Sequence, residues 1–309
     1  MIIAKSALVK SQMDCKMNLG ADALEIQLLD ELLRTNNLYS AFPNLDEYLN
    51  YPVYSVHTPL VECKDITSRV DIALEVLVRS NYIQLFENVC KLANKFGVAQ
   101  SRVVWIVAHS NLSSSSLETS NKDIIEFIVE SLIILFEKYG NIGIALENVT
   151  PVSYFSNGSF RLSNNFLFDN AEIIKCLRAK MPEFSNRLVT VLDTCHAEMS
   201  IQFMRSMDIL FDNEIIAIPR MQDYFKANKD TLKFIHFSRT VLNGNGIDRH
   251  GQPFNEQSRD YIRGILDCIN KYAKDCDIVL EVAETDYNKS LGFDISNKLV
   301  KEGLDFFKE

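Results

Sequence analysis

The sequence of 309 residues has seven cysteines but no pair spaced C-x-x-C, and the seven are widely scattered. An odd and scattered set is typical of reduced thiols, so we expect neither a disulfide partner nor a thiolate zinc site. Cys195 is the cysteine that lies among candidate site residues. We expect it to be a small buried core residue, and its use as a nucleophile is the alternative.

Long apolar runs are missing as well. No stretch approaches about 18 uninterrupted apolar residues, which argues against a membrane-spanning helix, and the first apolar run is too short for a secretory signal. Low-complexity segments and short repeats are also absent, so disordered and solenoid architectures are disfavoured. We therefore expect one globular domain over residues 1–309 that acts in the cytoplasm, without a membrane partner.

Positive charge is in deficit, because the net charge is −9. This balance argues against binding of nucleic acid or anionic membrane by the whole surface. It leaves room for a local basic groove, especially where bound metal cations add positive charge.

What the sequence does contain is an alternation of short apolar, β-branched runs with segments of helical period. The runs are residues 2–8, 23–29, 53–59, 102–110, 143–149, 187–196, 232–238 and 277–284. The clearest amphipathic segments are residues 70–96, 121–139, 171–181, 259–273 and 295–307. Eight strands joined by crossovers predict an α/β fold, and at this length a single closed (β/α)8 TIM barrel is the economical form. An open doubly wound sheet is the alternative, although no G-x-G-x-x-G follows any run.

The five histidines all fall at or after the ends of predicted strands, none on a predicted helix, and acids fall at four of the same ends. The histidines are His57, His109, His196, His236 and His250, and the acids are Glu147, Asp193, Asp248 and Glu281. Because the carboxyl ends of barrel strands meet on one face, these side chains should converge there. Imidazole and carboxylate are the usual ligands of zinc and manganese, and nine of them exceed the needs of one ion. We predict several cations that share a bridging carboxylate.

Simpler explanations exist for single pairs. Asp193 and His196 could be a helix-capping pair, and Asp248 and His250 could be turn residues beside Gly251. They do not account for every histidine lying at a strand end together with these acids.

The chain resembles the xylose isomerase-like TIM barrels, and within them the apurinic endonuclease IV family. The resemblance runs from "GADALEIQL" through "SVHTP", "IVAHS", "ALENV", "LDTCHA", "FIHFS" and "GIDRHG" to "VLEV". It implies up to three zinc ions, with manganese possible as the metal. The implied ligands are His57, His109 and Glu147 for the first ion, Glu147, Asp193, His236 and Glu281 for the second, and His196, Asp248 and His250 for the third.

Three positions bear on how far the resemblance extends. Glu284 could take the place of Glu281 with a shift of three residues. Nucleases of the family carry a tyrosine and then an asparagine, which contact DNA, after the first histidine; here Leu60 and Cys63 stand in that stretch. The metal chemistry of the family is therefore matched better than its reading of DNA.

Two catalytic functions follow. In the first, the protein hydrolyses phosphodiester or phosphate ester bonds with a multinuclear centre, Glu147 orients the water, and Arg239 and Arg249 bind phosphate, unless these arginines are exposed loop charges. In the second, one cation held by the residues implied for the second ion serves a sugar or sugar phosphate isomerase or epimerase, in which Glu147 and Glu281 move a proton. The partner is a small phosphorylated or sugar substrate, or damaged DNA. A binding module with a degenerate site is a third alternative.

The segment 151–168 is the longest insertion at the predicted active face. We predict a lid over the substrate with Tyr154, Phe155 and Arg161 as contacts, and surface elaboration or a subunit contact is the alternative. Glu25 could be a site residue of the second strand or a paired structural acid.

Overall fold

A computed structural model describes residues 1–29, 31–35, 37–62, 69–150, 152–154, 160–162, 168–207, 210–211, 214–215, 218–242 and 248–306. The structure describes the side chains of all residues except 30, 33–34, 36, 60–71, 151–167, 206–217, 241–250 and 307–309.

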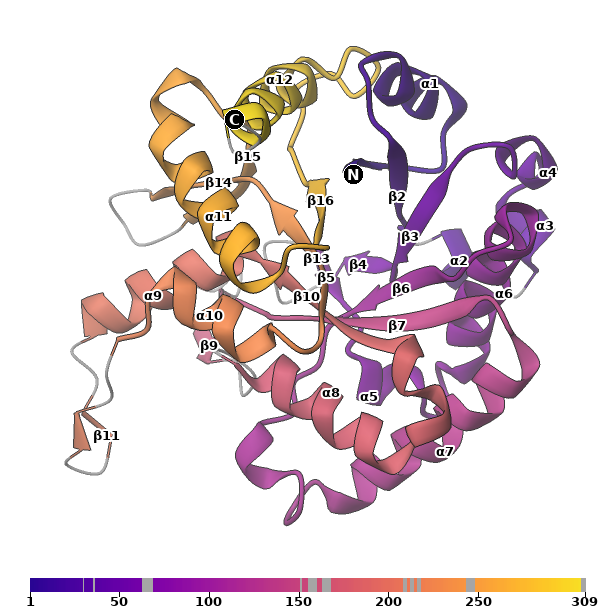
Figure 1. Ribbon diagram of the computed structural model, residues 1–309. Helices are drawn as coiled ribbons and strands as arrows, with labels where there is room; N and C mark the ends of the chain where they lie inside the picture. The colour runs from indigo at the N-terminus through magenta and orange to yellow at the C-terminus, as the bar shows by residue number, and fades with distance from the viewer. Residues whose placement is uncertain are drawn as a thin grey trace.

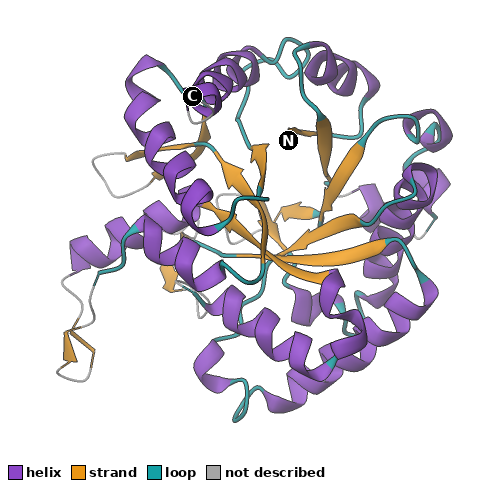
Figure 2. Cartoon of the chain, viewed as in Figure 1, coloured by secondary structure: helices purple, strands orange, loops and turns teal. Residues whose placement is uncertain are grey.

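A closed parallel barrel forms the centre of the molecule, as Figures 1 and 2 show, so the predicted TIM barrel is confirmed and the open sheet is wrong. Within the described residues its eight strands are β1 Ile2–Ser6, β2 Ala23–Gln27, β3 Val53–His57, β6 Val104–Ala108, β7 Ile142–Glu147, β10 Leu188–Asp193, β13 Leu232–Phe237 and β16 Asp277–Leu280. One strand corresponds to each predicted run, and only β7 starts outside its run, by one residue. The barrel closes where β1 pairs with β16 in parallel, with Ala4 opposite Leu280.

Helices surround the barrel on its outside (Figure 2). The longer ones are α1 Lys10–Asn18, α6 Ile83–Gln100, α7 Lys122–Lys138, α8 Asp169–Lys180, α9 Thr194–Met207, α10 Met221–Asn228, α11 Arg259–Tyr272 and α12 Leu291–Phe306. Short helices and 3₁₀ turns are α2 Glu31–Arg34, α3 Leu38–Ala41, α4 Leu45–Tyr48, α5 Leu74–Leu77, η1 Ser114–Ser116, η2 Pro182–Arg187 and η3 Glu256–Ser258. Among the described helices, none has the length and apolarity needed to cross a bilayer.

The predicted helix over 70–96 is wrong at its start. The chain there forms the end of strand β5 (Arg69–Asp71), then α5, and only then α6. The reason is the exposed stretch 79–82, whose Ser80 and Asn81 favour a turn and interrupt the apolar period.

Further strand pairs follow the barrel strands as two-stranded sheets, namely β4 (Leu60–Glu62) with β5, β8 (Val152–Tyr154) with β9 (Phe160–Leu162), β11 (Leu210–Phe211) with β12 (Glu214–Ile215), and β14 (Arg239–Leu242) with β15 (Asp248–Gln252).

A small apolar cluster, separate from the main core, contains one or two residues from each barrel strand. Its members are Ile3, Ala23, Tyr54, Trp105, Val107, Ala145, Val189, Val191, Phe234 and Val279. Trp105 belongs to it, and its ring lies over Gly143, where an added Cβ would come within 2.4 Å of the indole. The charged and histidine side chains of most strands lie two residues further on, as with Ala145 and Glu147. Because side chains at i and i+2 share one face of a strand, these polar residues form the next layer toward the carboxyl end of the barrel.

Candidate metal centre

The predicted ligands whose side chains are described all lie at this carboxyl end. His57, Glu147 and Asp193 are the last residues of β3, β7 and β10, and His236 is the last residue but one of β13. His109 and Glu281 directly follow β6 and β16. His196 lies in the first turn of α9, so the prediction that no histidine is on a helix is wrong for this residue. Its position follows from Asp193, whose Oδ1 accepts a hydrogen bond from the His196 backbone N at 2.8 Å and so caps α9.

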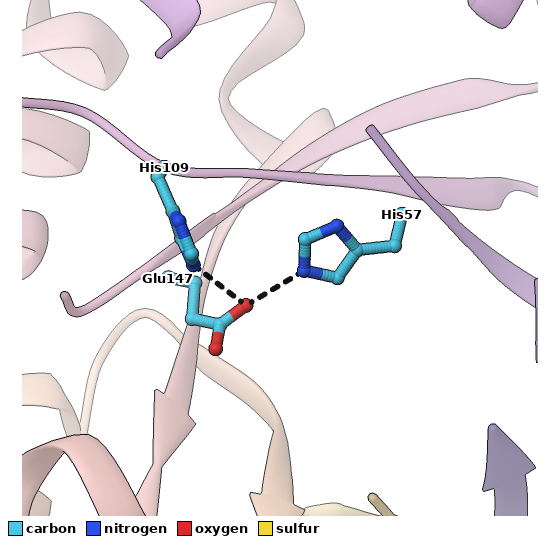
Figure 3. Close-up of side chains that lie close together, drawn as sticks. All are labelled: His57, His109 and Glu147. Atoms are coloured by element: carbon cyan, nitrogen blue, oxygen red, sulfur yellow. Dashed lines mark hydrogen bonds and ion pairs between the residues drawn. The ribbon is translucent and has the colours of Figure 1, made fainter. Parts of the chain in front are cut away.

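One group of candidate ligands consists of His57, His109 and Glu147, shown in Figure 3. The Nε2 atoms of the two rings lie 3.2 Å and 3.3 Å from the same oxygen of Glu147, Oε2. Neighbouring ligand atoms around a tetrahedral zinc ion are roughly 3.3 Å apart, given zinc–ligand bonds of about 2.0 Å. The three donor atoms are therefore spaced as a shared cation requires.

A second group consists of Glu147, Asp193, His236 and Glu281, each offering a ligand atom within 4.8 Å of the others. Nδ1 of His236 lies 3.2 Å from Glu147 Oε1 and 2.9 Å from Glu281 Oε2. This nitrogen is buried, and it makes no hydrogen bond to any described residue. A buried ring nitrogen that faces two carboxylate oxygens fits a metal ligand.

Glu147 belongs to both groups through different oxygens. Oε2 faces His57 and His109, while Oε1 faces His236. The side chain is buried, and burial by itself raises the pKa of the carboxyl, but His236 and His109 outweigh burial and hold that pKa well below its ordinary value. Glu147 is therefore an anion whose two oxygens face the two candidate ligand groups.

Three of the histidines have one ring nitrogen fixed by an oxygen acceptor. Nδ1 of His57 donates to the Thr58 carbonyl at 3.2 Å, and Nδ1 of His196 donates to the Asn148 carbonyl at 2.7 Å. Nε2 of His236 lies 3.1 Å from Glu25 Oε1. Such partners are typical of metal-binding histidines, because they fix the tautomer and the ring orientation.

A buried set of supporting residues, Lys5, Glu25 and Ser55, lies behind the second group, and the sequence prediction did not include Lys5 or Ser55. Lys5 Nζ contacts Glu281 Oε1 at 2.7 Å and Glu25 Oε1 at 3.7 Å. Burial lowers the pKa of Lys5, but Glu281 and Glu25 raise it above its ordinary value, so Lys5 is a cation. A charged residue at an inward position near the end of an apolar run was the signal available for both Lys5 and Glu25.

The choice between Glu281 and Glu284 is settled by their partners. Glu284 Oε1 forms a buried ion pair with Lys16 Nζ at 3.0 Å and accepts a hydrogen bond from Phe293 N, while Oε2 accepts from Gly292 N. Glu284 therefore holds the start of α12. Glu281 is the residue that belongs to the ligand group.

Several predicted site residues fall on side chains outside the described part of the structure. These are Asp248, Arg249 and His250, whose backbone lies in β15, and Tyr154, whose backbone ends β8. Phe155 and Arg161 of the predicted lid are likewise outside it. Arg239 begins β14, directly after the strand that carries His236, and is half-buried. The third ion, the lid and the phosphate-binding arginines stay predictions.

Cys195 has the character of a core residue. Its Sγ is buried and lies 3.1 Å from Ser238 Oγ, and burial raises the pKa of the thiol to about 12. A thiol with this pKa is protonated at neutral pH and is a poor nucleophile.

A cavity of about 420 Å³ adjoins the second ligand group. Its lining includes Lys5, Gln12, Gln27, Glu281 and Tyr287. Its polar residues come from the ends of β1, β2 and β16 and the segments that follow them. A ligand in this cavity would contact Glu281 directly.

Comparison of the sequence with protein-family models and with curated proteins finds no match. Solved structures with the same architecture do match. A xylose isomerase domain protein from Planctomyces limnophilus superposes with a TM-score of 0.55 at 10% identity, covering 98% of both chains. The likeness shows a shared closed barrel fold. A D-tagatose 3-epimerase-like protein gives 0.54 at 16% identity over 99% of this chain and 98% of its own, and the IOLI protein with a binding zinc atom gives 0.51 at 16% over 98% and 96%. These likenesses confirm the fold expected from the sequence.

Proposed function

We propose that this chain is a metal-dependent hydrolase of phosphate ester or phosphodiester bonds that works with at least two divalent cations bridged by Glu147. The observation that carries the proposal is the placement of the two Glu147 oxygens, one in each ligand group. The nitrogens of His57 and His109, which face the other oxygen of Glu147, are the donors that would hold a cation beyond the one in the second group.

Charge supports more than one cation. The centre contains four carboxylates, those of Glu25, Glu147, Asp193 and Glu281, and the ammonium of Lys5. With neutral imidazoles its net charge is therefore −3. One divalent cation would leave the centre negative. Two would make it positive, which suits an anionic phosphate.

The residues have separate tasks in this proposal. Zinc ions, which bind imidazole nitrogen and carboxylate oxygen, would supply Lewis-acid chemistry at phosphate oxygens. Glu147 would hold the cations as a bridging carboxylate and orient the attacking water. Arg239 and Arg249 are proposed to bind the phosphate, and His196, Asp248 and His250 to hold a third cation.

A second candidate is a single-metal sugar or sugar phosphate isomerase or epimerase. It is favoured by the cavity beside Glu281, whose volume suits a small ligand better than duplex DNA. In this function Glu147 and Glu281 would remove and return a proton on carbon. The D-tagatose 3-epimerase-like protein is a structural neighbour, and the same chemistry is proposed here only as the alternative.

The deciding experiment combines a metal count with two assays on the protein as purified. Elemental analysis gives cations per chain. The assays are hydrolysis of bis(p-nitrophenyl) phosphate, p-nitrophenyl phosphate and an oligonucleotide with an abasic site, and deuterium incorporation into a panel of ketoses and ketose phosphates. Two or more cations with hydrolysis supports the proposal, whereas one cation with deuterium exchange supports the alternative. Binding of metal without either reaction would favour a non-enzymatic module.

A further inference from the structure

The ring of His236 is fully buried and has different surroundings at its two nitrogens. Nε2 lies 3.1 Å and 3.2 Å from the two oxygens of Glu25. Nδ1 lies on the opposite side, toward Glu147 and Glu281. A carboxylate can only accept, so the hydrogen of a neutral ring belongs on Nε2, and Nδ1 then presents its lone pair.

Glu25 is itself held from the strands on both sides. Strand register places it opposite Lys5 of β1 and opposite Ser55 of β3. Ser55 Oγ donates a hydrogen bond to Glu25 Oε2 at 2.7 Å, and Lys5 Nζ lies 3.7 Å from Oε1. Glu25 has no measurable exposure, so water cannot replace these partners. The Ser55 hydroxyl and the Lys5 ammonium both face its oxygens, and these contacts favour the carboxylate form of Glu25.

We propose that Glu25 is a positioning residue that fixes the tautomer and orientation of His236, so that Nδ1 and not Nε2 binds the cation of the second ligand group. The inference rests on the metal centre of the proposed function and holds for the hydrolase and the isomerase alike. Glu25 does not bind the cation itself, because it lies across the ring from Glu147. The other neutral tautomer, with its hydrogen on Nδ1, would place the Nε2 lone pair against the Glu25 carboxylate, and this repulsion disfavours it.

The wild-type protein provides the first test. Two-dimensional ¹H–¹⁵N spectra of the histidine side chains, recorded with zinc bound and assigned through His236→Ala, should show His236 protonated at Nε2 and zinc-bound at Nδ1. Zinc binding through Nε2 would overturn the proposal. If the wild-type chain binds no divalent cation at all, the proposed metal centre fails, and this outcome is distinct from a wrong tautomer.

Variants of Glu25 test the effect on affinity. Glu25→Leu removes the acceptor with little change of volume, and it should weaken zinc binding to the second group by about tenfold or more in a chelator competition. Glu25→Gln keeps an acceptor for Nε2–H and should recover most of the affinity. Asp277→Asn is the matched control, because Asp277 is a partly buried acid at the other end of β16, paired with Tyr54 and the amino terminus.

A merely structural role for Glu25 predicts a different pattern. Glu25→Leu would then lower the melting temperature in excess chelator while the zinc dissociation constants of the folded protein stayed unchanged, and that result would overturn the proposal. If the Leu variant does not fold, the tautomer of His236 in Glu25→Gln and in the wild type is the test. Nε2 of His236 should carry the hydrogen in both proteins. A mixed or reversed tautomer in the wild type would contradict the inference.

Discussion

Lys5 Nζ lies 2.7 Å from Glu281 Oε1, across the seam where β1 meets β16 and the barrel closes. The contact brings together residues that are 276 positions apart in the sequence. Lys5 also approaches Glu25, so one cation compensates two carboxylates that support the second ligand group. The centre therefore contains its own positive charge before any metal binds.

Replacement of Lys5 by Met should destabilise the metal-free protein, because Glu281 and Glu25 lose their compensating charge. Breaking a buried ion pair costs about 3–5 kcal/mol, and the slight exposure of Lys5 places the expected loss toward the lower end. Zinc should then raise the melting temperature of Lys5→Met by more than it raises that of the wild type. Urea unfolding in EDTA and thermal scans with zinc measure both effects. Lys10→Met, at an exposed pair with Asp14, is the control and should change little.

Replacement of Glu147 by Gln should reduce metal binding in both ligand groups, because the amide offers one oxygen in place of two. We expect the bound metal to fall by at least one cation per chain and turnover to fall by about 100-fold or more. His109→Gln should affect only the first group, since His109 contacts Glu147 through Oε2. Elemental analysis of the two variants distinguishes these cases. A full metal complement in Glu147→Gln would contradict a bridging role.

Replacement of Glu by Gln should have different effects at Glu281 and at Glu284. Glu281→Gln should weaken metal binding, since this carboxylate faces His236. Glu284→Gln should leave the metal content unchanged and lower the free energy of unfolding by about 3 kcal/mol, because the buried Lys16 loses its anionic partner at the start of α12. Denaturant titrations and metal analysis of both variants check this. Loss of metal in Glu284→Gln alone would reverse the assignment.

Glu75 predicts a pH dependence that is separate from the metal centre. Burial raises the pKa of this carboxyl, although the Asn111 backbone N–H opposes the shift. A raised folded-state pKa means that the folded protein favours the protonated acid, so this contribution to stability is present below the ordinary pKa near 4.5 and is lost as pH rises through the raised value. Glu75→Gln should therefore gain stability relative to the wild type between pH 4.5 and 7. The difference between the two unfolding free energies, measured by urea at several pH values, should follow this direction.

The sequence predicts the barrel well because each strand is an apolar run buried on both faces, with a helical segment or turn between runs. Convergence of His57, Glu147, Asp193 and His236 followed from their places at strand ends, since the fold brings such ends together whatever their separation along the chain.

Other features depended on tertiary contacts that no short pattern reports. Lys5 looked like an ordinary member of an apolar strand, and Glu25 was open between a site residue and a paired structural acid. The register of β1 with β2 makes them neighbours. His196 lies on a helix because Asp193, the last residue of its strand, also caps the helix that follows. The spacing of the two residues in the sequence did not show whether Asp193 would act as this cap. The turn at 79–82 was hidden inside a longer apolar period.

The closure of the barrel has a consequence for synthesis in the cell. The second ligand group needs Glu281, and its support needs Lys5 from the opposite terminus of the chain. The strands that carry Glu147 and Asp193 are synthesised before β16, which precedes Glu281. Cations can therefore be captured in the finished geometry only after β16 and Glu281 have been synthesised, and a nascent polypeptide that lacks them would leave the second ligand group incomplete.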